Sequence, residues 1–196
     1  DRTGKVLVPF NYEEAADDED VIKVKRNNLW GLIDRKGKTI TPVKYQMIKD
    51  FRGGLAPFLI DDKWGYLDKG GKEVVPATYA YADEFRGGFA AVGFNARYGF
   101  IDKTGDEVIA VKYDWVEPFY ENRAAVYKDR KWGFVNEYGV EVIPLKYDFL
   151  GESRGFAYGR IAVALNDLNE KWGVIDREGR EVAPFKYEQL EYYSGG

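Results

Sequence analysis

The sequence predicts an all-β protein built from tandem three-stranded units of about 34 residues each. Three observations carry this prediction: a Trp-Gly pair that recurs at a fixed interval, an Asp-x-x-Gly segment that follows each pair, and an unusual composition. The 196 residues include 15 Tyr, 12 Phe, 5 Trp and 22 Gly. Aromatic sequences punctuated by glycine favour strands and tight turns over helices.

The recurring pair is Trp-Gly or, in one copy, Tyr-Gly. Its aromatic residue is Trp30, Trp64, Tyr98, Trp132 or Trp172, at intervals of 34, 34, 34 and 40 residues. The remaining positions of the unit are Asp34, Asp68, Asp102, Asn136 and Asp176; Gly37, Gly71, Gly105, Gly139 and Gly179; Pro42, Pro76, Ala110, Pro144 and Pro184; and Tyr45, Tyr79, Tyr113, Tyr147 and Tyr187. Self-similarity at this period indicates a repeat protein.

We expect one domain over residues 1–196. It begins with a partial copy at 1–29 and continues with repeats at 30–63, 64–97, 98–131, 132–171 and 172–196, the last incomplete. Residues 192–196 match residues 50–54 of an earlier unit, so the chain holds six copies of one half of the unit and five of the other. We expect its ends to result from truncation or cleavage of a longer array.

Each unit is expected to hold three short strands, as at 124–127, 132–135 and 141–143. Asp or Asn would open a turn by accepting backbone N–H groups, and the following Gly would take the left-handed conformation. The Gly after Trp would leave room for a neighbouring ring or backbone, and the proline would end a strand or mark an edge. The repeated Trp and Tyr side chains are expected in a shared core, since one unit cannot bury them alone.

The units are expected to form an open, twisted array, similar to a β-solenoid or superhelix. The alternative is a closed β-propeller. Three strands per unit are one fewer than in the usual propeller blade. The chain also starts and ends in the same half of the unit, without a complementary closing strand.

The composition excludes several functions. The chain has no Cys and no His, so disulfides, thiolate metal sites and catalytic triads that use His are impossible. The net charge is −4 and no basic stripe is present, which argues against nucleic-acid binding. No apolar run approaches the length of a membrane-spanning helix, so no membrane insertion is expected. The single Asp per unit and the lack of a distinctive carboxylate pair predict no metal, cofactor or catalytic residues.

The segments Lys63–Asp68, Lys131–Val135 and Lys171–Asp176 resemble the WG-repeat family, also called KWG repeats. The resemblance covers essentially the whole chain, with Tyr98, Ala110 and Asn136 as departures from its pattern. It implies a bacterial β-rich repeat protein from a family without a common catalytic activity. Together with the absence of Cys, it also suggests a location outside the cytoplasm. The ligand stays open.

The candidate binding residues lie where the repeat is irregular. An acidic run replaces the Phe-x-Gly-Gly segment of the other units, and it is either a solvated edge or a contact for a basic partner. Two lengthened segments, 149–154 and 166–170, are either neutral insertions or the mark of a binding face. The residues concerned are Asp17, Asp18, Glu19 and Asp20 in the acidic run, and Asn166, Asp167 and Asn169 in the second lengthened segment.

Aromatic residues outside the repeat positions are further candidates. They either belong to the core or form a surface that stacks on sugar rings or anchors a protein partner. We single out Trp115, Tyr120 and Tyr158 among Tyr81, Trp115, Tyr120, Tyr127, Tyr138, Tyr158 and Tyr193. We therefore expect a non-enzymatic scaffold that binds another protein, as a monomer or as part of a larger protein. A carbohydrate-binding module is the alternative, and a hydrolase is a third, less favoured function.

Overall fold

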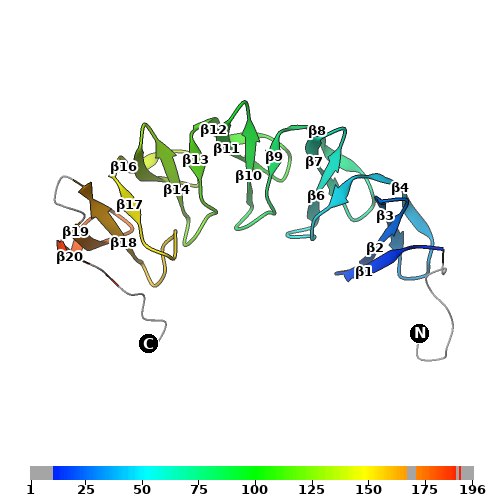
Figure 1. Ribbon diagram of the computed structural model, residues 1–196, viewed down its shortest axis with the longest axis horizontal. Helices are drawn as coiled ribbons and strands as arrows, with labels where there is room; N and C mark the ends of the chain where they lie inside the picture. The colour runs from blue at the N-terminus through cyan, green and yellow to red at the C-terminus, as the bar shows by residue number, and fades with distance from the viewer. Residues whose placement is uncertain (1–10, 167–170, 189, 191–196) are drawn as a thin grey trace. The chain divides into compact units, whose positions relative to one another are not determined.

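The computed structural model describes residues 11–166, 171–188 and 190 (Figure 1). These residues form twenty strands in five four-stranded antiparallel sheets, and none of the sheets closes on itself. The predicted fold class, an all-β tandem repeat, is confirmed. Contacts between residues divide the chain into two parts that are each larger than one repeat. We call them the first unit, residues 1–94 with 103–105, and the second unit, residues 95–102 with 106–196.

Each sheet consists of strands that are consecutive in the sequence. The first contains β1 (Glu14–Asp18), β2 (Val21–Arg26), β3 (Leu29–Asp34) and β4 (Thr39–Tyr45), and the second contains β5 (Met47–Ile48), β6 (Leu55–Ile60), β7 (Lys63–Asp68) and β8 (Glu73–Tyr79). The third contains β9 (Tyr81–Ala82), β10 (Phe89–Phe94), β11 (Arg97–Asp102) and β12 (Glu107–Tyr113). The fourth contains β13 (Trp115–Val116), β14 (Arg123–Lys128), β15 (Lys131–Asn136) and β16 (Glu141–Tyr147), and the fifth contains β17 (Phe149–Leu150), β18 (Arg160–Leu165), β19 (Lys171–Asp176) and β20 (Glu181–Tyr187).

The prediction of three strands per unit is wrong. A further short strand joins each sheet at its edge; in the second sheet it is β5, where Met47 pairs with Leu59 and Ile48 with Phe58. Two residues are too few to produce a recognisable alternation of apolar and polar side chains, so the sequence pattern does not reveal this strand. Four strands is the number in the usual propeller blade, so the strand count does not argue against the propeller alternative.

The proline of the repeat lies inside an edge strand. The predicted strand at 141–143 extends as β16 to Tyr147 and passes through Pro144. An edge strand tolerates proline because one of its sides carries no ladder, so a missing N–H costs no hydrogen bond there. Of the two expectations for this proline, the edge is correct and the strand end is wrong.

The glycine after each Trp admits a neighbouring backbone. The register of β7 with β8 shifts between Trp64 and Tyr66, which places Gly65 opposite a bulge in β8. A Cβ at residue 65 would lie 2.5 Å from the carbonyl oxygen of Val75. At Gly133 the corresponding distance to the carbonyl oxygen of Ile143 is 2.7 Å. The expected close approach is confirmed.

The Asp-x-x-Gly segment is a hydrogen-bonded turn. The backbone N–H groups of Lys36 and Lys38 both donate to Asp34 Oδ1 at 2.8 Å. The N–H of Gly37, whose φ is 83°, donates to the carbonyl oxygen of Asp34 at 2.9 Å. Asn136 Oδ1 accepts the equivalent bonds from the residues two and four positions later. An amide oxygen therefore replaces the carboxylate without loss of the turn.

The core of each unit lies between successive sheets. In the first unit, Leu32 of β3 packs with Phe58 of β6 and with Phe51, which lies between β5 and β6. In the second unit, the ring centroids of Phe134 in β15 and Phe156, which lies between β17 and β18, are 4.9 Å apart. The residue two positions after the repeat Trp thus packs against a Phe that follows the short edge strand of the next sheet.

The repeat Tyr and Trp residues differ in burial. Tyr45, Tyr113 and Tyr147 are fully buried, as predicted, whereas Tyr79 is half-buried and Tyr187 is exposed, contrary to the prediction. Trp30, Trp64, Trp132 and Trp172 are only half-buried, so the prediction that they belong to the core is only partly correct. Each of these Trp residues pairs across the sheet with the repeat Tyr, for example Trp132 with Tyr147. These four Trp residues therefore keep only part of their surface exposed.

Candidate ligand-binding surface

An aromatic strip runs across the second unit. Trp115, Tyr127 and Trp132 face one another on neighbouring strands of the fourth sheet, because Tyr127 pairs with Trp115 on one side and with Trp132 on the other. Directly paired residues of an antiparallel sheet present their side chains on the same face. We use the name aromatic strip for Tyr98, Trp115, Tyr127, Trp132, Phe149 and Trp172.

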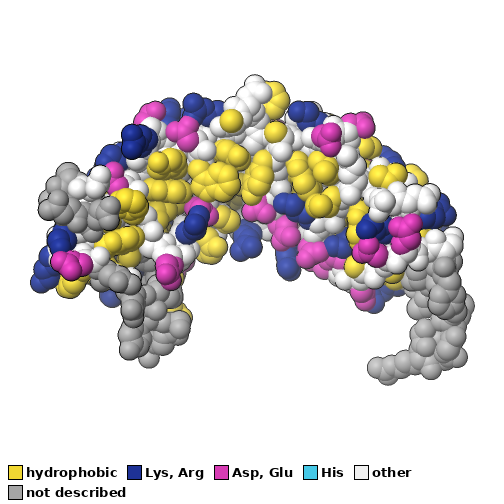
Figure 2. Space-filling view, viewed as in Figure 1, with side chains coloured by type: hydrophobic (Ala, Val, Ile, Leu, Met, Phe, Trp, Pro, Cys, Tyr) yellow, Lys and Arg dark blue, Asp and Glu magenta, His cyan; other side chains and the backbone are white. Residues whose placement is uncertain are grey.

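The rings of the strip are close neighbours. Ring centroids are 4.9 Å apart for Tyr98 and Trp115, and 4.9 Å apart for Tyr127 and Trp132. Phe149 and Trp172 follow at 6.5 Å. Figure 2 shows hydrophobic side chains gathered over β13 and β14, with Lys, Arg, Asp and Glu around them.

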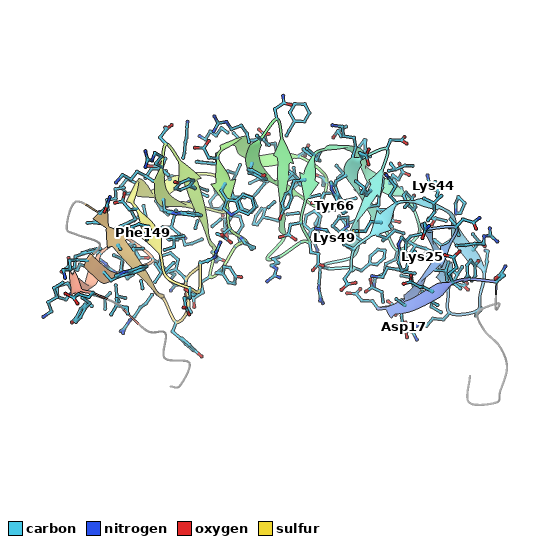
Figure 3. The ribbon with its side chains drawn as sticks, in the orientation of Figure 1. Asp17, Lys25, Lys44, Lys49, Tyr66 and Phe149 are labelled. Atoms are coloured by element: carbon cyan, nitrogen blue, oxygen red, sulfur yellow. The ribbon has the colours of Figure 1, made fainter. Side chains whose placement is uncertain are left out.

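Two pockets open beside Phe149, which Figure 3 labels. The larger has a volume of about 520 Å³ and is lined by Trp132, Phe149, Leu150 and Trp172 together with Gly151, Glu152, Arg154 and Leu190. The other, about 400 Å³, is lined by Tyr127, Phe149 and Asn166 together with Asp129, Arg130, Lys131 and Asp148. A ligand that crosses Phe149 would contact both pockets.

The lengthened segment after β17 is anchored to the fourth sheet. A Cβ at Gly155 would overlap the ring of Tyr120, so the backbone of this loop lies directly on that ring. The N–H of Gly159 donates to Glu121 Oε2 at 2.8 Å. The middle and the end of the loop between β17 and β18 are therefore held in place, and so is the pocket wall that this loop forms.

Ion pairs flank the strip. Glu117 Oε1 accepts hydrogen bonds from Trp115 Nε1 at 3.1 Å and from Arg154 Nη1 at 2.9 Å. Asp148 accepts from the backbone N–H of Asn166 at 2.8 Å and from Lys131 Nζ at 2.7 Å. The bond from Asn166 and, to a smaller extent, the bond from Lys131 hold the pKa of Asp148 below its usual range. Asp148 is therefore ionised at neutral pH.

The equivalent rings of the first unit are covered by lysines, which Figure 3 labels. Lys25 Nζ lies 5.5 Å from the ring centroid of Trp30. Lys49 Nζ lies 4.9 Å from the ring centroid of Trp64 and 5.6 Å from that of Tyr81. Cation–π contacts of this kind occupy ring faces that a ligand would otherwise use.

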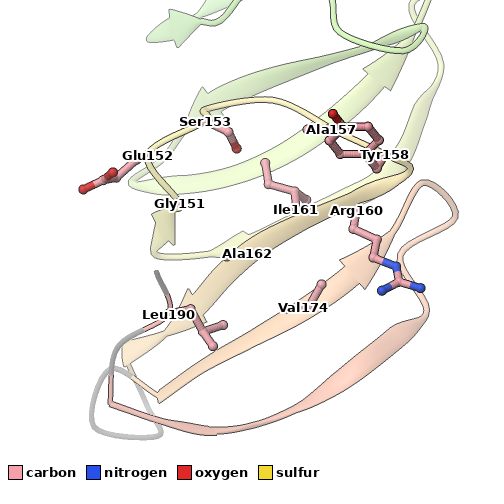
Figure 4. A pocket seen from close by; sticks show the side chains of 10 residues that line it. All are labelled: Gly151, Glu152, Ser153, Ala157, Tyr158, Arg160, Ile161, Ala162, Val174 and Leu190. Atoms are coloured by element: carbon pink, nitrogen blue, oxygen red, sulfur yellow. The ribbon is translucent and has the colours of Figure 1, made fainter. Parts of the chain in front are cut away.

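The predicted aromatic candidates separate into three places. Trp115 belongs to the strip, and Tyr120 supports the loop beneath Gly155. Tyr158 is exposed and lines a different pocket of about 280 Å³, where Ser153 and Ile161 point into the space between the loop and β18 (Figure 4). The structure therefore does not bring Trp115 and Tyr158 together in one pocket.

The polar candidates of the second lengthened segment are only partly described. Asn166 lines the pocket beside Tyr127. Asp167 and Asn169 lie outside the described residues.

The acidic run is engaged in ion pairs within the first unit. Asp17 contacts Arg35 at 2.8 Å, and Asp18 contacts Lys23 at 3.1 Å. Lys69 contacts Glu19 at 2.5 Å and Asp20 at 2.9 Å. The side-chain hydrogen bond from Lys69 lowers the pKa of Asp20. These carboxylates thus link the start of the first sheet to β2, to the turn after β3 and to the turn after β7.

Several residues of the strip were missed by the sequence reasoning. Trp115 was classed as lying outside the repeat, but it is equivalent to Met47, Tyr81 and Phe149, at intervals of 34 residues, in the short edge strands. Trp132 and Trp172 were assigned to the core. The signal that could have found the strip is the replacement of Met47 by larger aromatic residues in the later units.

The described residues contain no helix that is long and apolar enough to cross a membrane. Within the same residues, no group of three or more Asp or Glu side chains is placed to hold a metal ion.

The fold and this surface define a tandem β-repeat scaffold. A family model described as "WG containing repeat" matches residues 1–30, 30–64, 64–97, 98–132, 132–168 and 172–196. The chain belongs to this family of WG-repeat proteins. A comparison with curated proteins gave no match.

Solved structures resemble the chain only at the level of the β fold. The Hsv2 protein of Kluyveromyces lactis aligns with a TM-score of 0.48 at 10% identity, over 86% of this chain and 60% of that one. PorZ of Porphyromonas gingivalis aligns with a TM-score of 0.42 at 11% identity, over 91% and 29%. The chain thus spans less than two thirds of the length of these structures.

Proposed function

We propose that this chain is a non-enzymatic scaffold whose second unit binds another protein through the aromatic strip. The observation that carries the proposal is the strip itself, six neighbouring aromatic residues on the surface of one unit. Contiguous exposed apolar surface commonly marks an interaction site. Trp, Tyr and Arg dominate the binding energy of protein interfaces, and Trp132, Tyr127 and Arg154 lie together here.

A further feature supports a binding role. The strip lies mostly on paired strands, which hold their side chains more rigidly than loops do.

A carbohydrate ligand is the second candidate function. The pocket beside Tyr127 and Phe149 favours it, because Asn166 and charged side chains surround aromatic rings there. Such a pocket offers both a ring face and hydrogen-bond partners to a sugar.

The test is a comparison of immobilised variants. Phe149 and Met47 are exposed and occupy equivalent edge-strand positions, so Met47→Ala is a matched control for Phe149→Ala. In a lysate of the source organism, wild type and Met47→Ala should capture the same protein, identified by mass spectrometry. Phe149→Ala should lose it.

Capture of the same protein by the wild type and by both variants would contradict the proposal. Binding on a glycan array that requires Phe149, without protein capture, would favour the carbohydrate function. Hydrolysis of any substrate that one carboxylate substitution abolishes would overturn the non-enzymatic assignment.

A further inference from the structure

Three ion pairs along the aromatic strip share one orientation. They are Arg97–Asp114, Lys131–Asp148 and Arg154–Glu117. In each pair the cation is the more exposed partner: side-chain exposures are 50% against 35%, 42% against 16%, and 65% against 12%. A fourth pair at the end of the strip, Lys171–Glu188, has the reverse order. Beside most of the strip, solvent therefore meets the basic ends of the pairs.

The buried carboxylates already serve donors within the chain. Glu117 accepts from both Trp115 and Arg154, and Asp148 accepts from Lys131 and a backbone N–H. Arg154 Nη1 makes the contact with Glu117, and a guanidinium carries five N–H donors. Arg154 can therefore keep its partner and still donate to a ligand carboxylate.

An apolar site adjoins this donor. Arg154 lines the same pocket as Trp132, Phe149 and Trp172, and its volume of about 520 Å³ admits a large side chain. An apolar group placed against the three rings would bring neighbouring atoms of the same ligand to the guanidinium. Charge-assisted hydrogen bonds to a carboxylate are the stronger kind of hydrogen bond.

We propose that the partner presents a protein segment with a large apolar or aromatic anchor side chain flanked by acidic residues. The anchor fills the pocket between Trp132, Phe149 and Trp172, and the flanking carboxylates accept from Arg154 and Lys131. This inference rests on the proposed function and names the chemistry of its partner. Asp129 and Glu152 are exposed in the same pockets, and their negative charges offset the positive charges of the basic residues at a distance. Recognition of the acidic residues therefore acts through direct contacts with Arg154 and Lys131 rather than through long-range attraction.

The probe is a fluorescein-labelled peptide of about 15 residues with a central Trp between glutamates. Matched peptides replace the glutamates by glutamine or lysine, or the Trp by serine. The acidic Trp peptide should bind at least about tenfold more tightly than the lysine peptide. A change of about tenfold in affinity is what the loss of one hydrogen bond to a charged group produces. Arg154→Gln should weaken binding of the acidic peptide about tenfold.

The control is Arg52→Gln, which removes an exposed arginine that is paired with Glu84 in the first unit. It should leave the affinity unchanged. Equal or tighter binding of the lysine peptide, an unchanged affinity for Arg154→Gln, or no binding by any peptide overturns the inference. Preference for polygalacturonate fragments over all peptides overturns it as well.

The two proposals fail in different ways. Peptide binding that requires Phe149 but ignores the glutamates removes the acidic chemistry and leaves the protein-binding function in place. Capture of the natural partner that does not depend on Phe149 removes the protein-binding surface itself.

Discussion

Gly65 and Val75 lie so close that a Cβ at residue 65 would sit 2.5 Å from the carbonyl oxygen of Val75. The contact holds the bulged edge strand β8 against β7. It also explains why glycine follows the aromatic residue in every unit, since any side chain would push the two backbones apart. The same close approach occurs at Gly133 and Gly173, directly after Trp132 and Trp172 of the strip.

Gly65→Ala should destabilise the protein by about 2–3 kcal/mol, in the range of overpacked substitutions. The added methyl would overlap backbone atoms that cannot move without breaking the β7–β8 pairing. Chemical denaturation measures the loss. Gly70→Ala is the control, because a Cβ there would meet only the side chain of Asp68, at 3.2 Å. Equal stability of the two variants would contradict this explanation of the glycine.

Lys23→Ala should cost about 2–4 kcal/mol, because it leaves the nearly buried carboxylate of Asp18 without its cation. Lys23 also contacts Asp50 at 2.5 Å, and so links β2 to the segment between β5 and β6. Glu14→Ala breaks the more exposed pair with Lys25 and should cost less than about 1 kcal/mol. Thermal and denaturant unfolding should rank the two variants in this order; the reverse ranking would show that the Lys23 cluster does not stabilise the unit.

Asp34→Asn should remove one acid-sensitive contribution to stability while keeping the turn, as Asn136 already does in its own unit. The backbone N–H of Lys38 is the first cause that lowers the pKa of Asp34 from its ordinary value of 3.8. A carboxyl whose pKa is lower in the folded state than in the unfolded state stabilises the protein at a pH above its unfolded-state pKa. This stabilisation is lost as the pH falls through the folded-state pKa. The wild type should therefore lose stability relative to Asp34→Asn below about pH 4. Parallel acid unfolding curves would contradict the prediction.

Tyr66→Phe should destabilise the first unit by about 1 kcal/mol. The buried hydroxyl of Tyr66 donates to the carbonyl oxygen of Asp83 at 2.8 Å, and the variant leaves that oxygen without this donor. Burial raises the pKa of Tyr66 above its usual range, so its hydroxyl should stay protonated while exposed tyrosines titrate. The absorbance of tyrosinate, measured against pH, checks this prediction. Compared with the wild type, Tyr66→Phe should lose one tyrosine that ionises only when the protein unfolds. An identical titration curve for the wild type and the variant would contradict the prediction.

Much of the fold could be predicted from the sequence because its determinants are local. The Asp-x-x-Gly turn depends on residues within four positions of Asp34. The glycine after Trp is required because a Cβ there would overlap the backbone of the neighbouring strand. The two-residue edge strands could not be predicted. Their pairing, as between Phe149 and Ala164, is set by contacts with residues about 15 positions away rather than by a pattern of their own.

The strip was only partly predictable for the same reason. The sequence marks Trp115 as an aromatic residue outside the repeat positions, whereas the regular recurrence of Trp132 predicts a core residue. In the structure, Trp132 is half-buried beside Tyr147, which pairs with it across the sheet and is fully buried. Arg154 lies in the lengthened segment 149–154, but the sequence does not distinguish it within that segment, since its position depends on Glu117, 37 residues earlier in the chain.

The indole N–H resonances of the five Trp residues test the central claim most directly. On addition of the captured partner to the isotope-labelled chain, the signals of Trp115, Trp132 and Trp172 should shift. Those of Trp30 and Trp64, whose rings are covered by Lys25 and Lys49, should stay in place. Shifts confined to Trp30 and Trp64, or no shift in the second unit, would contradict a binding surface on the aromatic strip.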